Sequence, residues 1–374
     1  MKLRSLLAIG SSAFVLAACQ GQDASDPAVE EPATEEEDTG TDAGEDAGED
    51  AGEDAGEETE AVDFSIAMIT DEGGVDDRSF NQSAWEGMQA WGEEHGLSEG
   101  DGYAYFQSND SSDFVPNLNQ ALAADYDIIY GIGYQLLNSV NDVADQNPEQ
   151  HFGIVDDISD RDNVVSLTFR DHEAAFLAGV AAAETTETGM VGFIGGIAGP
   201  VIDRFQTGFE AGVAHVDDSI EVDVQYAESF TDEGIGQQIA AGMYANGADV
   251  VYHAAGAVGN GVFTEARNRM ESDPDTQIWV IGVDRDQEEE GEYDGGNLTL
   301  TSTIKAVGSS ISQSANLTMD EGFPGGENIA YGLEEEGVDL VQGNMSDEAW
   351  SSVEDARQGV IDGEIEVPEF SYSE

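Results

Sequence analysis

Cysteine, basic side chains and long apolar runs are all scarce in this chain of 374 residues. Cys19 is the only cysteine, so no disulfide can form within the chain. Beyond the N-terminal segment, no stretch approaches the roughly 18 consecutive apolar residues that a membrane-spanning helix needs. The 11 Lys and Arg residues face 80 Asp and Glu residues. We therefore expect no nucleic-acid partner and no acidic membrane surface as a partner, because binding to phosphates depends on basic side chains.

The sequence also lacks the common signatures of enzymes and metal sites. It contains no G-x-S-x-G, H-E-x-x-H or Walker A motif. The five histidines are scattered without the spacing of metal ligands. The acidic stretch at 156–163 lacks the glycine and the final glutamate of an EF-hand loop. We expect no catalytic residue, no bound metal and no cofactor.

The N-terminus has the pattern of a processing signal. A basic start is followed by an apolar stretch at 6–16, which is too short to span a bilayer, and then by small residues before Cys19. The sequence Leu-Ala-Ala-Cys at 16–19 resembles the cleavage box of bacterial lipoproteins. A chance cysteine beside an ordinary secretory signal is the alternative. We expect 1–18 to be a signal peptide and Cys19 to carry a lipid that anchors the mature chain to the membrane.

The next segment, 19–62, has almost no large apolar side chains and repeats the sequence Ala-Gly-Glu-Asp. Such a segment cannot bury enough surface to offset the entropy of ordering, so we predict a disordered, self-repelling tether. Residues 20–63 hold 19 of the acidic side chains, and two of the basic ones, Lys2 and Arg4, lie in the predicted signal peptide, which leaves 61 acidic and 9 basic residues for residues 64–374.

The remaining part of the chain therefore carries a formal charge of about −52. A folded body of that charge repels itself in dilute buffer, but the Debye length falls to about 3 Å at 1 M salt. A halophilic source is the natural interpretation. An acidic surface that collects calcium is the weaker alternative, because the acids are spread over the whole chain.

From residue 63 onward, short apolar runs alternate with longer amphipathic stretches, which is typical of α/β folds with parallel sheets. Helical patterns occur between most of the strands, for example at 115–124, 173–183, 204–215 and 236–245. The strands fall into two successive series, which predicts two doubly wound lobes. The expected strands are 64–70, 103–106, 127–133, 151–156 and 163–169, followed by 190–196, 221–230, 249–256, 277–284 and 298–305.

The loop after the first strand leads into a helix that starts with unusual side chains. Ser79 and Gln82 fit the capping box S-x-x-Q, which puts Phe80 and Asn81 in the first helical turn. Ligands of such sheets bind beyond the carboxyl ends of the strands. Phe80 could instead close the start of the helix by a hydrophobic contact. Its neighbour Asn81 favours a role for both residues in a ligand-binding cleft, because an amide can bind the edge of a heterocycle while a ring stacks on its face.

Several motifs in order resemble one known family. The segments "DDRSFNQSAWEG", "GIVDD", "NVVSLTFRDHEAAFLAG", "TGMVGFIGGIAGPVIDRFQTGFEAG", "YAESFTD", "AAGAVGNGVF", "IGVDRDQ" and "LTLTSTIK" are similar to the basic membrane protein (Bmp) family of lipoproteins, and specifically to its purine nucleoside receptor branch. The resemblance covers about residues 63–322 and fades beyond them.

This resemblance implies a type I periplasmic-binding-protein fold, in which crossing segments between two lobes act as a hinge. It implies lobe boundaries at 63–168 plus about 288–325 for the first lobe, and at 169–287 plus about 326–374 for the second. The ligand would be a purine nucleoside, namely inosine, guanosine or adenosine, and the partners would be the permease subunits of an ABC transporter.

The resemblance also implies the residues of the pocket. Phe80 and Phe230 would stack on the base, while Asn81 and Asp156 would bind its edge. The Asp156 assignment could slip by one position to Asp157. Glu228 departs from the family motif "GSFTD" but leaves Phe230 in place. The sugar-binding set would be Asp71, Gly256, Asp284 and Lys305.

Physical chemistry agrees with these roles. A carboxylate can accept hydrogen bonds from both vicinal hydroxyls of a ribose, each contributing about 1.5 to 3 kcal/mol. Lys305 is the only lysine besides Lys2, so we expect it to donate to sugar oxygens and to balance the charges of Asp71 and Asp284. A solvated acid at Asp284 and a salt bridge to surplus carboxylates at Lys305 are the alternatives. Phe205 competes for a cleft role, but its spacing with Phe209 predicts helix core.

The resulting prediction is a lipid-anchored, extracytoplasmic solute-binding protein that captures purine nucleosides for an ABC importer. Another small polar ligand, such as a sugar or an autoinducer, is the alternative within binding proteins. A ligand-sensing subunit of a membrane signalling kinase is the alternative from another class. A nucleoside hydrolase is less favoured, because no acid–base pair stands out from the acidic background.

Overall fold

The structure, a computed structural model, describes residues 62–273 and 275–370. The predicted signal peptide, the predicted lipidation site at Cys19 and all of the predicted tether before residue 62 lie outside the described residues. Within the described part of the chain, none of the helices combines the length and the apolar character that a bilayer crossing needs.

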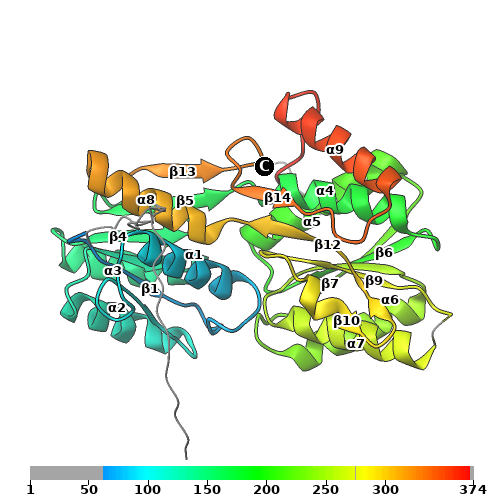
Figure 1. Cartoon of the computed structure of the whole chain (residues 1–374), viewed down its shortest axis with the longest axis horizontal. Coiled ribbons are helices and arrows are strands. Elements are labelled where there is room, and N and C mark those ends of the chain that lie inside the picture. The colour runs from blue at the N-terminus through cyan, green and yellow to red at the C-terminus, as the bar shows by residue number, and fades with distance from the viewer. Residues whose placement is uncertain (1–61, 274, 371–374) are drawn as a thin grey trace, which may run out of the picture. The chain divides into compact units, whose positions relative to one another are not determined.

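Two six-stranded sheets form the framework of the described residues (Figure 1). The first sheet has the order β13-β5-β4-β3-β1-β2 and is parallel throughout. Its strands are β1 (Ile66–Ile69), β2 (Tyr103–Phe106), β3 (Ile128–Gly131), β4 (His151–Val155), β5 (Val164–Phe169) and β13 (Asn328–Tyr331). The prediction of an α/β fold with parallel sheets is confirmed.

The second sheet has the order β14-β12-β9-β8-β6-β7. It is parallel except for β14, which pairs with β12 in the antiparallel sense. Its strands are β6 (Met190–Gly195), β7 (Glu221–Tyr226), β8 (Val250–Ala254), β9 (Trp279–Gly282), β12 (Thr299–Lys305) and β14 (Val338–Leu340). A separate hairpin consists of β10 (Glu292–Tyr293) and β11 (Gly296–Asn297).

Helices cover both faces of each sheet, as a doubly wound fold requires. On the first sheet, α2 and α3 pack on one face and α1 and α8 on the other, where α8 lies beside α1 (Figure 1). On the second sheet, α6 and α7 oppose α4, α5 and α9. The helices are α1 (Phe80–Glu94), α2 (Phe114–Ala123), α3 (Leu137–Gln146), α4 (Asp171–Thr185), α5 (Pro200–Val216), α6 (Glu233–Asn246), α7 (Val258–Ser272), α8 (Val307–Glu321) and α9 (Asp347–Ile361).

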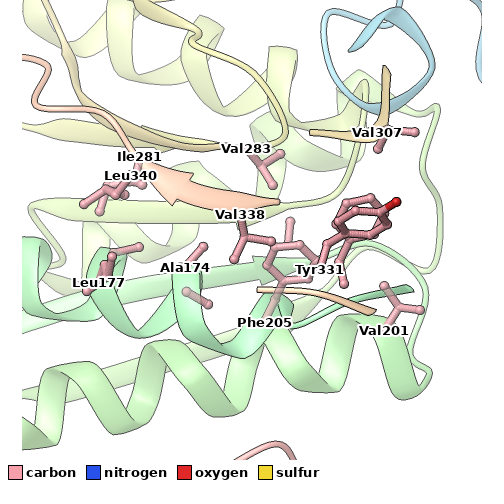
Figure 2. Packing of buried hydrophobic residues seen from close by; sticks show 14 of the residues in the cluster. Ala174, Leu177, Val201, Phe205, Ile281, Val283, Val307, Tyr331, Val338 and Leu340 are labelled. Atoms are coloured by element: carbon pink, nitrogen blue, oxygen red, sulfur yellow. The ribbon is translucent and has the colours of Figure 1, made fainter. Parts of the chain in front are cut away.

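The apolar residues of the central strands are buried on both faces, which explains why these strands read as continuous apolar runs. In β1, Ile66 and Met68 face the layer of α1, whereas Ala67 and Ile69 face the layer of α2. Figure 2 shows part of the larger core, in which Phe205 of α5 lies among residues from several elements.

Three segments in the described residues pass from one sheet to the other. They join β5 to α4, β12 to α8, and β13 to β14. The predicted lobe boundaries are wrong at this point, because β12 belongs to the second sheet and β13 to the first. Sequence periodicity identifies a strand but not its neighbours, and the chain crosses between the sheets after Lys305 and again after Tyr331.

Candidate ligand-binding site

A single cavity brings together all eight residues that the sequence singled out as ligand-binding. Its walls enclose about 600 Å³, including the open space at its mouth. The wall from the first lobe consists of loops after β1, β3 and β4 and the first turn of α1. The wall from the second lobe comes from α5 and from the carboxyl ends of its strands. The eight residues are Asp71, Phe80, Asn81, Asp156, Phe230, Gly256, Asp284 and Lys305.

Aromatic rings enter the cavity from both lobes. Phe80 is half-buried in the first turn of α1, and Phe230 is half-buried after β7. The ring of Tyr134, from the first lobe, meets Phe230 edge-on with 6.5 Å between the centroids. A Cβ atom on Gly196 would collide with the ring of Phe230, so a glycine at this position lets the ring settle against the backbone.

Two backbone positions beside Phe230 adopt the left-handed conformation. Gly256 has φ of 57°, and a Cβ atom there would lie 3.1 Å from the carbonyl oxygen of Phe230. Glu228 has φ of 54°, a conformation that costs a side-chain-bearing residue about 1 to 2 kcal/mol. This strain accounts for the glycine of the family motif at the position that Glu228 occupies.

The start of α1 is capped by Asp77 and not by Ser79. Ser79 is the N-cap residue, but its side chain makes no capping hydrogen bond. Its hydroxyl donates instead to Asp284 in the other lobe. Gln82 reaches back to the backbone N–H of Arg78, not to that of the N-cap residue. The predicted capping box is therefore wrong, because the nearby carboxylate is the stronger acceptor for the first-turn N–H groups.

The carbonyl oxygen of Asn81 is the part of its amide that has no partner among the described residues. Its amide nitrogen donates to Asp71, 2.7 Å away, and to Asp77, 3.0 Å away. Both N–H bonds of the amide are thus in use. Its Oδ1 is buried and has no hydrogen-bond partner among the described residues. Of the donor and the acceptor that an amide can offer to the edge of a heterocycle, Asn81 therefore has only the acceptor free.

Asp156 and Asp284 occupy corresponding places in the two lobes. Asp156 follows β4 directly, and Asp284 follows β9 by two residues. Both are buried, and both have left-handed backbones, with φ of 69° and 68°. Aspartate tolerates this conformation better than most residues. The neighbouring Asp157 is half-buried and lies outside this cavity, so the cavity holds Asp156 and not the position one residue further.

Lys305 is buried in a network of charges that joins the lobes. Its ammonium lies 2.6 Å from Asp156 Oδ1 and 3.0 Å from Asp171 Oδ1. Arg204 binds the other oxygen of Asp171, at 3.1 Å. The ammonium also lies 5.3 Å from the centre of the Phe80 ring.

The predicted balance of Lys305 against Asp71 is wrong, because the direct partners of its ammonium are Asp156 and Asp171. Burial alone lowers the pKa of Lys305, but the charges of Asp156, Asp171 and Asp284 outweigh it and raise that pKa above its ordinary value. The ammonium therefore stays charged, and it balances Asp284 only at longer range.

Two acids of the cavity have pKa values shifted towards neutrality. Burial raises the pKa of Asp71 to about 6, against hydrogen bonds from Gly73 and Asn81 that lower it. Burial raises the pKa of Asp284 to about 7, although Lys305 and Ser79 act in the opposite direction. Both carboxyls therefore change their charge near neutral pH, and a ligand that contacts them can shift their pKa values further.

Several residues of the site were missed or rejected from the sequence. Phe205 is buried in the core, as predicted, but it also lines the cavity, so its exclusion was wrong. Tyr134 and Gln135 line the cavity from a short 3-10 helix after β3 (Tyr134–Leu136) that carries no motif. Each has a buried oxygen without a partner among the described residues. No signal for this position was therefore found in the sequence analysis.

Polar contacts hold the two lobes together at the start of α1. Gln287 donates to the carbonyl oxygen of Arg78 at 2.8 Å, and Arg78 pairs with Glu290. Arg285 lies 3.2 Å from Glu86. With the contact between Ser79 and Asp284, these bonds join the first-lobe wall of the cavity to the loop after β9.

Comparison with known proteins agrees with this architecture. A family model described as ABC transporter substrate-binding protein PnrA-like (Bmp) matches residues 64–371. A CD4+ T-cell-stimulating antigen of Listeria innocua is 51% identical over 316 residues, which cover 82% of this chain and 88% of that protein. The ABC transporter nucleoside-binding protein BmpA of Lactococcus lactis is 49% identical over 314 residues, 82% of this chain and 89% of its own.

Among solved structures, an ABC transporter solute-binding protein from Aeropyrum pernix superposes with a TM-score of 0.71 at 25% sequence identity. The match covers 82% of this chain and 94% of that one. The predicted periplasmic-binding-protein type of fold is thus confirmed. Since the family match spans nearly all of the described residues and the sequence identity to relatives is high, this chain belongs to the Bmp family of PnrA-like ABC transporter substrate-binding proteins.

Proposed function

We propose that this protein captures purine nucleosides between its two lobes and delivers them to an ABC importer. The observation that carries the proposal is the pairing of Phe80 with Phe230 across one cavity that also holds buried acids and the single cavity lysine. Rings from opposite lobes suit a flat heterocycle, and each stacked base contributes about 1 to 3 kcal/mol. The relative from Lactococcus lactis is named as a nucleoside-binding protein, which supports the same ligand class.

The polar groups suit the sugar and the edge of the base. Asp71, Asp284 and Lys305 offer acceptors and a donor to ribose hydroxyls, and the backbone of Gly256 allows close approach. Asn81 and Asp156 offer acceptors to the base. Because these groups come from both lobes, a ligand that contacts all of them binds the closed arrangement preferentially.

The location that we propose is the outer face of the cell membrane. Residues 1–18 would act as the signal peptide, Cys19 would carry the lipid, and the acidic segment that follows would act as a tether. The support for this part comes from the sequence pattern alone.

Calorimetric titration with inosine in high-salt buffer tests the proposal. Phe80→Ala removes one stacking face and Asp284→Ala removes an acceptor for hydroxyls, so we expect each to weaken binding at least tenfold. Phe323→Ala and Asp294→Ala are matched controls outside the cavity, and they should bind like the unmodified protein. Near-normal affinity in both cavity variants, or no binding of inosine, guanosine or adenosine to the unmodified protein, would remove the assignment.

A further inference from the structure

We propose that Asp77 is a positioning residue that holds the Asn81 amide with its oxygen towards the ligand, so that the site selects bases that present an N–H group there. This inference rests on the proposed function. It assigns a role to a residue of the segment "DDRSFNQSAWEG" that the sequence analysis left without one, and it adds a rule of selectivity to the cavity.

Asp77 is the common acceptor for the start of α1. It is buried, and its Oδ1 accepts the backbone N–H groups of Ser79 at 2.8 Å and Gln82 at 3.1 Å. Its Oδ2 accepts the backbone N–H of Asn81 at 3.0 Å. These bonds fix the carboxylate firmly against the helix, because each of its oxygens meets N–H groups that have no partner inside the helix.

The same carboxylate determines which way the Asn81 amide faces. Asp77 Oδ2 and Asp71 Oδ1 lie 3.0 and 2.7 Å from the amide nitrogen of Asn81. Reversing the amide would put its oxygen against two carboxylate oxygens, with no hydrogen between them. The orientation is therefore set by the two acids, and Asp77 is held more firmly than Asp71, whose carboxylate receives one backbone N–H.

The oxygen that results is a buried acceptor in need of a donor. Asn81 Oδ1 has no partner among the described residues, and Asn81 lines the cavity. Leaving a buried acceptor without a partner is unfavourable, and a ligand N–H can supply the missing donor. Gln135 Oε1, in the wall of the same cavity, is a second buried acceptor without a described partner. A base edge that carries only acceptors is thus penalised.

Inosine and purine riboside are the probes for this rule. The base of inosine carries one N–H group, whereas that of purine riboside carries none, and both have the same sugar and a similar flat ring system. In calorimetric titrations of the unmodified protein, we expect inosine to bind at least tenfold more tightly, the factor that corresponds to about 1.4 kcal/mol.

Asp77→Asn is the decisive variant. The new amide keeps one oxygen for the backbone N–H groups but puts its own N–H₂ group against the amide nitrogen of Asn81, so only Asp71 still holds the Asn81 oxygen towards the ligand and the orientation is no longer fixed. We expect the preference for inosine to fall to threefold or less. Asp110→Asn is the matched control: Asp110 accepts the N–H of Ser112 at 2.8 Å in an exposed cap outside the cavity, and this variant should keep the full preference.

Thermal unfolding of each variant shows whether Asp77→Asn is folded, and Asn81→Ala provides a second route because it removes the acceptor itself. Asn81→Ala should also lose the preference for inosine. Equal binding of the two nucleosides by the unmodified protein overturns the inference but leaves the proposed function intact. An unchanged preference in folded Asp77→Asn or in Asn81→Ala also overturns it. If neither nucleoside binds the unmodified protein, the proposed function fails and this inference fails with it.

Discussion

We expect Asp71 and Asp284 to make the proposed binding of a nucleoside depend on pH. Burial raises the pKa of Asp71 to about 6 and that of Asp284 to about 7, so both are largely protonated at pH 5. Ribose hydroxyls donate to carboxylates, and such a ligand binds the ionised forms preferentially. Ligand binding should therefore release protons in this pH range.

We predict that inosine binds about tenfold more weakly at pH 6 than at pH 8. At pH 6 the carboxyl of Asp284, with its pKa of about 7, is mostly protonated, whereas at pH 8 it is mostly ionised. The stability of the ligand-free protein should change in the opposite direction. A raised carboxyl pKa contributes stability that is complete below the ordinary value near 4 and is lost as the pH rises through 6 and 7. Titrations in buffers of different ionisation enthalpy measure the proton release directly, and an affinity that is flat between pH 6 and pH 8 would contradict the role of these acids.

Lys305 shows how far a single residue could be interpreted from the sequence. The family resemblance put Lys305 in the ligand set and its rarity favoured the same role, but neither predicted that it is buried in the wall of the cavity. Its partner Asp171 was not predictable, because Asp171 is one acid among many and meets Lys305 only where the chain crosses between sheets at the start of α4. Residue type predicts the chemistry of a group, whereas its partners depend on the topology.

At the scale of elements, α1 is the helix that places Phe80 and Asn81, and its position depends on close packing against α8. Gly87 of α1 and Gly308 of α8 meet backbone to backbone, and a Cβ atom on either would collide with the other. The two helices can approach this closely only because neither residue has a side chain.

We predict that Gly87→Ala destabilises the fold by about 1 to 3 kcal/mol through overpacking and also weakens nucleoside binding, because α1 has to move. Gly242→Ala in α6 is the matched control. A Cβ atom there meets nothing within 4 Å, so this change should stabilise the protein by about 0.5 to 1 kcal/mol. Denaturant unfolding of the two variants measures both effects, and equal shifts would show that the contact between α1 and α8 does not constrain the helix.

The strands were predicted well and their arrangement less well. The predicted strand at 103–106 coincides with β2, and the predicted strand at 163–169 begins one residue before β5 and ends with it. The lobe that contains β12 could not be predicted, because apolar alternation is the same whichever sheet a strand joins. The cap of α1 was misassigned for a related reason: a capping box is a local pattern, but Ser79 finds its partner Asp284 across the cavity.

At the scale of the whole molecule, charge and lobe contacts set the conditions for function. The described lobes hold most of the surplus of acidic residues, and the prediction of a halophilic source remains a prediction. The contacts of Lys305 with Asp156 and of Ser79 with Asp284 are bonds between lobes inside the cavity. If the proposed ligand exchanges these contacts for its own, we expect closure and binding to be coupled through the same side chains.

The central claim is that a purine nucleoside lies between the lobes with its base against Phe80 and Phe230. A crystal structure of the protein grown with saturating inosine in high salt tests it most directly. Our account predicts the base between these two rings, its N–H group at Asn81 Oδ1, and the ribose hydroxyls at Asp284 and Lys305. An empty cavity at saturating inosine, or inosine bound elsewhere on the protein, would contradict it.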